Sequence, residues 1–486
     1  MKVLRLHTLR LLLMALIVLP ALTSCYDHGE ECEMQQEASS VNYIKLNISV
    51  RTSNAITRGT PLGGENGDGL EAGFARENTV DGITLILYRS DDGINAPGTT
   101  PIDFVRYYDT TLESRANQGT TNTTRFDEAV YTTGNRELDA KDGILTNTKY
   151  HAIVVANANL MGTFHKGSTL TDVRDYLVDG SMLYSGSGKM NDAGKFIMSS
   201  EADFTIDFTN TTPETYNEGK LYSFDNIYIE RLAARIDFWA NGSNGYKTKD
   251  KNNVDYPNPG YEYNVGSTTD RFVLVNVVPF NVSRGNEYLI KRTTHETTPY
   301  LANETVSSWV IDPYTSNKYE SSYPTYMESK LESIVSSTNF STLLYNVSMA
   351  SQQSNTEKYQ ISGADNMIVG YTSENTLNAS SLLYYNATGL AFEGYYYVDG
   401  DATRGERCVY YHYLRHQGES DAAYQALQAS ELSTSATCGL TTPMNFGIVR
   451  NNLYRVSVSG INSKTNLTIK IKVKKWDPFT HEVIYM

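Results

Sequence analysis

Hydrophobic and polar residues alternate most regularly near the C-terminus, over residues 466–476. Alternation with a period of two places one set of side chains on each face of a β-strand. The apolar set consists of Leu467, Ile469, Ile471 and Val473. The polar set consists of Thr468, Lys470, Lys472 and Lys474. We therefore predict a strand with one buried face at this end of the chain.

The same pattern occurs near the start of the chain, over residues 41–51. Its apolar members are Ile44, Leu46, Ile48 and Val50, and its polar members are Lys45, Asn47, Ser49 and Arg51. Because the two patterns match, we predict that the strands are interchangeable: a subunit loses its first strand and receives the C-terminal strand of another copy. Alternation alone fits equally well with two ordinary edge strands, each in its own domain.

The first strand is followed by a glycine-rich stretch, residues 52–78, which predicts a long exposed loop. Its glycines are Gly59, Gly63, Gly64, Gly67, Gly69 and Gly73. Proteases cut preferentially in such loops. Three arginines lie within or beside this loop and are candidate cleavage positions: Arg51, Arg58 and Arg76.

The rest of the chain shows many short apolar or alternating runs between turn signals. The expected strands cover residues 79–89, 150–157, 195–199, 203–208, 227–238, 271–279, 392–398, 408–416 and 451–459. We expect Pro279 to stop its strand and Gly460 to form a turn. Short helices are predicted over residues 171–179, 325–338 and 420–431. This pattern predicts an all-β protein of two β-sandwiches in series, with a few short helices.

The composition supports the all-β prediction and restricts the class of partner. The 486 residues include 36 tyrosines and 35 glycines, and aromatic residues favour strands. A net charge of −14 argues against nucleic acid or an anionic membrane surface as the main partner.

The N-terminus has the pattern of an export signal. Lys2, Arg5 and Arg10 precede an apolar run over residues 11–22, which ends in Leu-Thr-Ser-Cys25. This ending resembles a bacterial lipobox, in which the cysteine is lipidated and becomes the first mature residue. Several acyl chains on Cys25 would hold the precursor to a membrane. An ordinary signal peptide with a chance cysteine is the alternative interpretation.

Few residues are candidates for chemistry. His412 and His416 have a spacing that suits two metal ligands on a helix, but the surrounding residues favour a strand and a third ligand is not identifiable. We expect no metal site, no cofactor and, without a recognisable catalytic motif, no enzyme activity. Cys408 and Cys438 could form a disulfide or remain free thiols.

Three stretches of the sequence resemble the fimbrillins, the FimA/Mfa-type (type V) pilins of Gram-negative anaerobes, and in particular the Mfa-type major subunit. These stretches are residues 230–237 (Glu-Arg-Leu-Ala-Ala-Arg-Ile-Asp), 410–416 (Tyr-Tyr-His-Tyr-Leu-Arg-His) and 443–455 (Pro-Met-Asn-Phe-Gly-Ile-Val-Arg-Asn-Asn-Leu-Tyr-Arg). The resemblance extends over nearly the whole chain, and the third stretch is the most specific.

The resemblance implies a lipoprotein precursor carried to the outer membrane and two transthyretin-like Greek-key domains. It also implies cleavage by an arginine-specific protease in the loop after the first strand. Arg58 best matches the family's cleavage position, so the Arg58–Gly59 bond is our first choice, Arg51 the second and Arg76 the third. The expected parts are a signal peptide over residues 1–24, a propeptide over 25–58, and domains over 59–228 and 229–486.

The expected function is that of a fimbrial shaft subunit that polymerises by strand exchange and supports adhesion and biofilm formation. Its partners would be other copies of itself, accessory fimbrial subunits, the protease, and host or bacterial surface ligands. Its location would be the outer membrane and the extracellular fimbrium. An accessory tip or anchor subunit, or a monomeric glycan-binding surface lipoprotein, are the alternatives.

Overall fold

A computed structural model gives the structure of part of this protein. The described residues are 41–50, 70–72, 75–118, 126–138, 142–179, 195–200, 204–240, 242–280, 286–292, 310–313, 345–346, 359–361, 364–376, 388–414, 447–464 and 466–477. Cys25, Arg51, the Arg58–Gly59 bond and the two helices predicted over 325–338 and 420–431 lie outside these ranges. Within these ranges, no helix has the length and apolar character needed to cross a membrane.

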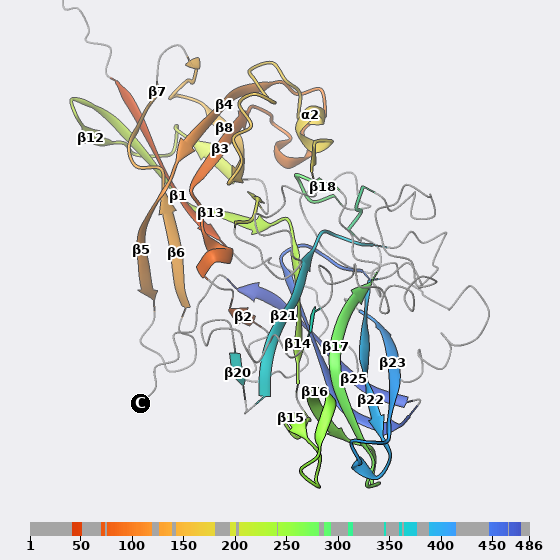
Figure 1. The fold of residues 1–486 in the computed structure, drawn as a ribbon. Helices are drawn as coiled ribbons and strands as arrows, with labels where there is room; N and C mark the ends of the chain where they lie inside the picture. The colour runs from red at the N-terminus through yellow and green to blue at the C-terminus, as the bar shows by residue number, and fades with distance from the viewer. Residues whose placement is uncertain are drawn as a thin grey trace, which may run out of the picture. The chain divides into compact units, whose positions relative to one another are not determined.

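The all-β prediction is confirmed, and the largest sheet contains the first strand of the chain (Figure 1). Among the described residues, eleven strands form this first sheet. Its main path runs β4 (Ile102–Asp109), β3 (Gly82–Tyr88), β8 (Lys149–Ala156), β10 (Met198–Ser200), β13 (Gly219–Arg231), β1 (Asn42–Val50), β6 (Phe126–Thr132) and β5 (Thr111–Gln118). β11 (Phe204–Asp207), β12 (Glu214–Tyr216) and β7 (Arg136–Leu138) pair with β8, β13 and β1 respectively.

The first sheet is apolar on both faces in its β3 and β8 region. Leu85 and Val154 belong to a core on one face, whereas Ile86 and Ile153 belong to a second core on the other. The continuous apolar run of these strands follows from burial on both sides.

Two further sheets contain the C-terminal half of the described chain. The second sheet has the order β2 (Leu70–Ala72), β25 (Asn466–Asp477), β24 (Asn452–Ser463), β14 (Ala234–Trp239), β21 (Ala364–Thr372) and β20 (Tyr359–Ile361). The third has the order β15 (Tyr246–Lys249), β16 (Asp255–Asn264), β17 (Arg271–Phe280), β22 (Gly389–Tyr397) and β23 (Gly405–Tyr413), and β19 (Tyr345–Asn346) pairs with β17.

Side chains from the second and third sheets share one core. Phe238 and Val456 of the second sheet belong to the same buried cluster as Phe272 and Phe392 of the third. The rings of Phe238 and Phe392 are 6.0 Å apart. The two sheets therefore pack face to face, as in a β-sandwich.

The described helices are short. They are α2 (Leu170–Arg174) and the 3₁₀ turns η2 (Ala75–Asn78), η3 (Gly93–Asn95) and η9 (Val398–Gly400). The helix predicted over 171–179 is present but shorter. It begins at a capping box in which the side chains of Thr169 and Asp172 accept each other's backbone N–H groups. After it ends, β9 (Leu177–Val178) pairs with β18 (Glu287–Tyr288).

The turn predicted at Gly460 is wrong, and the strand predicted to stop at Pro279 continues for one residue, to Phe280. Pro279 lies within β17 opposite Leu390, because β16 and β19 pair only with earlier residues of β17 and no N–H is needed at Pro279 for that edge. Gly460 also lies within a strand, since β24 continues through it to Ser463 before the chain turns into β25. The domain boundary predicted between residues 228 and 229 lies within β13 and stays a prediction.

Candidate strand-exchange site

The first strand is an internal strand of its sheet, not an edge. β1 pairs with β13 in parallel along one side. On its other side it pairs antiparallel with β7 over residues 42–44 and with β6 over residues 47–49. Figure 1 shows β1 between β13 and β6.

Thr133 closes the gap between the β6 and β7 ladders. Its hydroxyl accepts the backbone N–H of Leu46 at 3.0 Å, and its own N–H donates to the carbonyl of Leu46 at 3.1 Å. β1 is thus hydrogen-bonded on both sides. Removing it would leave two rows of unpaired backbone groups facing a strand-sized slot.

The four apolar side chains of β1 all point into the core of the first sheet. Ile44, Leu46, Ile48 and Val50 are each 0 % exposed. Their neighbours in the same core include Phe224 and Ile227 of β13. Burying one such side chain stabilises the fold by roughly 1.5–3 kcal/mol. The four buried side chains of β1 together therefore contribute substantially to the stability of the fold.

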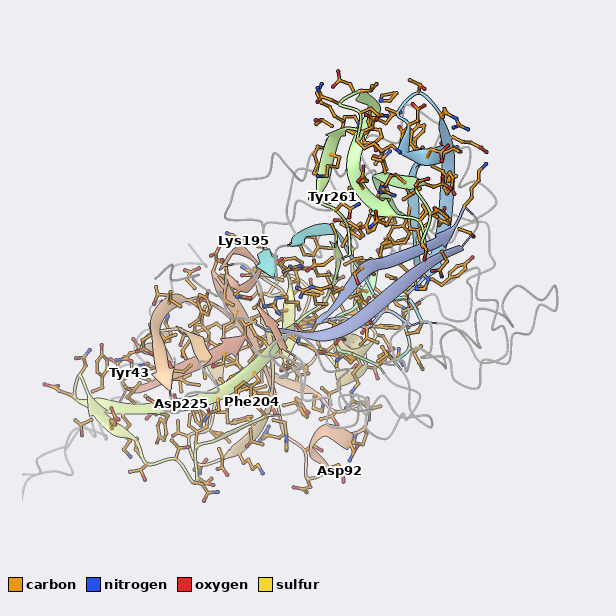
Figure 2. All side chains as sticks on the ribbon, turned by 90° about the horizontal axis from the view of Figure 1, so that it is seen from below. Tyr43, Asp92, Lys195, Phe204, Asp225 and Tyr261 are labelled. Atoms are coloured by element: carbon orange, nitrogen blue, oxygen red, sulfur yellow. The ribbon has the colours of Figure 1, made fainter. Side chains whose placement is uncertain are left out.

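The opposite face of β1 carries polar side chains with specific partners. Lys45 forms an ion pair with Glu113 of β5, at 2.7 Å between Nζ and Oε1. The side-chain amide of Asn47 donates to Asp225 of β13. Figure 2 shows Tyr43 and Asp225 in the same region of the sheet. Ser49 is only 4 % exposed, so this face is closed at that position.

The C-terminal strand β25 is paired in its own chain. It forms an antiparallel ladder with β24, in which Ile469 is opposite Val458, Ile471 is opposite Val456, and Val473 is opposite Tyr454. Leu467 is opposite Ile461 in the same ladder. These four partners in β24 belong to the core shared by the second and third sheets.

The other side of β25 is paired over a much shorter length. In the part of the chain that the structure describes, only β2 pairs there, opposite residues 475–477. Among the described strands, none pairs with positions 466–474 of β25 on this side, so the proposed donor strand has one complete ladder and a three-residue second one there.

The last residues of the predicted loop are anchored in the interior, so the prediction of an exposed loop over residues 52–78 is wrong for Glu77 and Asn78. Glu77, in η2, is 0 % exposed and accepts hydrogen bonds from Arg235 and Tyr371. Arg235 also makes a bidentate contact with Asp237, at 2.7 and 2.8 Å. A bidentate arginine between two carboxylates is the kind of geometry that makes a buried ion pair tolerable.

A second arginine fastens the same turn. Arg231 donates to the backbone carbonyl of Glu77 at 2.9 Å and to the side chains of Asn78 and Asn451. η2 is therefore held by β13, β14 and β21. Cleavage at Arg58 or Arg51 would leave this anchor intact.

A third buried cluster surrounds Arg450, which donates to Glu287 and Glu374 at 3.0 Å each. Burial, and then the charge of Glu374, raise the pKa of Glu287 well above its usual value. Burial acts to lower the pKa of Arg450, but Glu374 and Glu287 outweigh it and the pKa is raised.

Sequence reasoning missed the role of these charged residues. Glu230, Arg231, Arg235, Asp237 and Arg450 all belong to the stretches that carry the fimbrillin resemblance, and the structure places them in the interior. The sequence did contain one sign of this role: these charged residues stand beside apolar residues. A charged side chain that is buried among apolar residues requires a partner.

The remaining candidate residues are the histidines and cysteines that were considered for metal binding or a disulfide. His412 is buried in β23, and the described residues contain no group of three or more His, Cys, Asp or Glu side chains placed to hold a metal ion. Cys408 is a free, half-buried thiol, and burial raises its pKa. Cys438 and His416 lie outside the described residues.

No protein-family model matches the sequence, and no curated protein matches it. Solved structures do show similarity. The tip fimbrial protein Mfa3 from Porphyromonas gingivalis, with a C-terminal truncation, has 9% identity and a TM-score of 0.41. The match covers 89% of this chain and 100% of that one.

Two further structures have comparable scores. A fimbrilin (FimA) from P. gingivalis W83 has 13% identity and a TM-score of 0.38, with 91% of this chain and 99% of that one covered. A candidate cell adhesion protein from Parabacteroides distasonis has 14% identity and a TM-score of 0.39, with 90% and 98% covered.

Fimbrillins are thus among the structures similar to this chain. The resemblance that the sequence motifs predicted is found in this comparison as well. Because the TM-scores are below 0.5, the function of this chain is argued from its own geometry.

Proposed function

We propose that this protein is a structural subunit of an outer-membrane fimbrium, cleaved after an arginine and polymerised by strand exchange. It is exported as a precursor lipidated at Cys25, and the assembled fibre supports adhesion and biofilm formation. Its partners are other copies of itself, accessory fimbrial subunits, an arginine-specific protease, and host or bacterial surface ligands. It acts as a structural protein, not as an enzyme.

The observation that carries this proposal is the position of β1 in the chain and in the sheet. All strands that pair with β1 lie after residue 70, so residues 51–69 are its only covalent link to them. One cut within these residues, at the Arg58–Gly59 bond or after Arg51, would leave an internal strand held by noncovalent contacts alone. Its departure would open a slot with unpaired backbone on both sides.

A cut after Arg76 fits the structure less well. The bond lies inside η2, directly before the buried Glu77. Cleavage there would place a new charged terminus beside the ion pair of Glu77 with Arg235. Cleavage upstream avoids this cost, which supports Arg58 over Arg76.

The backbone pairing of β25 supports its role as the donor. Within the described part of its own chain it has one complete ladder and a second one of three residues. In the slot of another subunit it would be paired on both sides, as β1 is. Each added hydrogen bond contributes about 1 kcal/mol, so exchange increases the total pairing of this strand.

Repeating this contact produces a fibre. The slot and the donor strand lie at different places on each subunit, so every subunit can accept one strand and donate another. Such a head-to-tail contact does not close on itself and extends into a filament.

The test is the maturation of an Arg58→Ala variant. We expect the wild-type protein isolated from the cell surface to begin at Gly59 by N-terminal sequencing. The variant should remain a precursor and form no heat-labile oligomer ladder on an SDS gel. An Arg76→Ala variant is the matched control and should mature normally. Fibres built from subunits that retain a lipidated Cys25 would contradict the scheme.

A further inference from the structure

The polar side chains of β1 and the residues that they contact indicate the direction in which a replacing strand would run. The apolar face of the slot accepts any strand with four apolar side chains at alternate positions, whichever way that strand runs. The polar positions differ from one another in charge and in burial, so they distinguish the two directions. The orientation of the donor strand inferred from these positions rests on the proposed strand exchange.

Four successive positions on this face define what the slot requires. Position 43 is opposite Glu137 of β7, which is exposed. Position 45 holds a cation beside Glu113. Position 47 lies beside Asp225. Position 49 lies between Tyr228 and Val130 and is closed to solvent. The ring of Tyr43 packs edge-on against Tyr216, with 5.0 Å between the ring centroids. The slot thus suits a cation at positions 45 and 47 and a small polar side chain at position 49.

The donor strand has a matching but reversed pattern. Read from its C-terminal end, β25 presents Lys474, Lys472, Lys470 and Thr468 at alternate positions. If β25 runs opposite to β1 with Lys470 in the place of Asn47, then Lys472 lies beside Glu113 and Lys474 beside Glu137. Thr468 then takes the closed position of Ser49, and both residues are small and carry a hydroxyl group.

The apolar positions match in this arrangement too. Reversal about position 47 keeps the alternation, so Val473, Ile471, Ile469 and Leu467 take the places of Ile44, Leu46, Ile48 and Val50 in that order. The side-chain amide oxygen of Asn47 is buried and has no partner among the described residues. Lysine at this position would remove that orphan acceptor and place a cation beside Asp225.

The same-direction arrangement fits poorly. With Leu467 in the place of Ile44, Thr468 takes the position beside Glu113 and leaves this carboxylate without a cation. Lys472 then takes the closed position of Ser49, where its ammonium group would lose hydration. Only the contact of Lys470 with Asp225 is the same in both directions.

Reversal also changes the direction of pairing in each ladder. β1 is parallel to β13 along its longer ladder and antiparallel to β6 and β7 along its shorter ones. A reversed strand would be antiparallel to β13 but parallel to β6 and β7, so the longer ladder gains the slightly more stable pairing and the two shorter ladders lose it.

We propose that β25 of a second copy of this protein enters the β1 slot running opposite to β1, with Lys472 beside Glu113, Lys470 beside Asp225 and Thr468 in the place of Ser49. The acidic side chains along the slot are then specificity determinants that select a lysine-rich strand and fix its direction and register.

The first test is zero-length carbodiimide coupling of the assembled, cleaved protein, followed by peptide mass spectrometry. Mixed fibres of ordinary and ¹⁵N-labelled subunits identify joints between copies. We expect Lys470 joined to Asp225 and Lys472 joined to Glu113. The first joint is common to both directions and shows that the strand is in the slot. If it forms without the second, the proposed direction is wrong. If fibres contain neither joint, β25 is not the donor and the proposed exchange itself fails.

The second test is a charge exchange. The variants Glu113→Lys and Lys472→Glu should each slow assembly of the cleaved protein about fivefold, through like-charge contact at an exposed site. Combining them should restore the wild-type rate to within about twofold.

The matched control combines Glu113→Lys with Thr468→Glu, the pair that would meet in the same-direction arrangement. The cleaved control variant should still assemble slowly. Restoration by the control instead of the matched pair would overturn the proposed direction, and restoration by neither would overturn the register. A wild-type protein that forms no ladder after cleavage would contradict the proposed function and not only this inference.

Discussion

Arg450 shows how strongly a single residue depends on its tertiary surroundings. Two buried carboxylates, Glu287 and Glu374, share this one guanidinium group. In the sequence it stands between Val449 and Asn451 with no acidic neighbour. The three side chains stabilise one another only because β18, the end of β21 and the start of β24 come together in the fold.

At the residue scale, replacing Arg450 by methionine should destabilise the precursor by about 3–5 kcal/mol, because two buried carboxyl groups lose their counter-ion. Urea unfolding measures this change. The matched control is Glu287→Gln, which leaves Arg450 paired with Glu374 and should cost much less. An Arg450→Met variant as stable as the control would show that the cluster of Arg450, Glu287 and Glu374 contributes little to the free energy of unfolding.

At the scale of elements, β1 and β3 contribute to the same core but have different positions in the proposed assembly cycle. Leu46 of β1 and Leu85 of β3 are both 0 % exposed and belong to one cluster. In the proposed cycle, β1 is replaced during assembly, whereas β3 remains. β1 would therefore stabilise the precursor only, whereas β3 would stabilise both the precursor and the assembled fibre.

Leu46→Ala should therefore destabilise the precursor by about 2–5 kcal/mol and leave the assembled fibre unchanged. Leu85→Ala, the matched control, should weaken both. Urea unfolding of the precursor and the temperature at which the SDS-resistant ladder dissociates measure the two effects. A fibre weakened equally by both substitutions would indicate that β1 stays in place.

At the scale of the whole molecule, the proposed scheme gives each subunit one acceptor slot and one donor strand. Deleting residues 466–486 removes the donor but leaves the slot. We expect the deletion variant to be cleaved and unable to polymerise alone.

Mixing distinguishes loss of the donor from misfolding. Added to the wild-type protein, the cleaved deletion variant should accept one strand and stop growth, so that electron micrographs show shorter fibres. Removing only residues 478–486 is the control and should leave fibre length unchanged. Fibres of normal length from the deletion variant alone would exclude β25 as the donor.

The sequence by itself determined some of the strands and the apolar faces of the two most regular ones, but it did not predict β4, β5, β6, β16 or β21. Period-two alternation over residues 41–51 correctly predicted β1 and the burial of Ile44, Leu46, Ile48 and Val50. It also predicted β25. These features are local: they depend on side-chain spacing within one strand, which the sequence states directly.

Only the tertiary structure decided whether β1 is internal or at an edge, because its partners β6, β7 and β13 come from distant parts of the chain. The same holds for Glu77 and Arg235, whose contact joins residues 158 apart in sequence. The acidic neighbours of the slot, Glu113 and Asp225, also lie on separate strands. Pairing between distant strands depends on register and topology, which local periodicity does not specify.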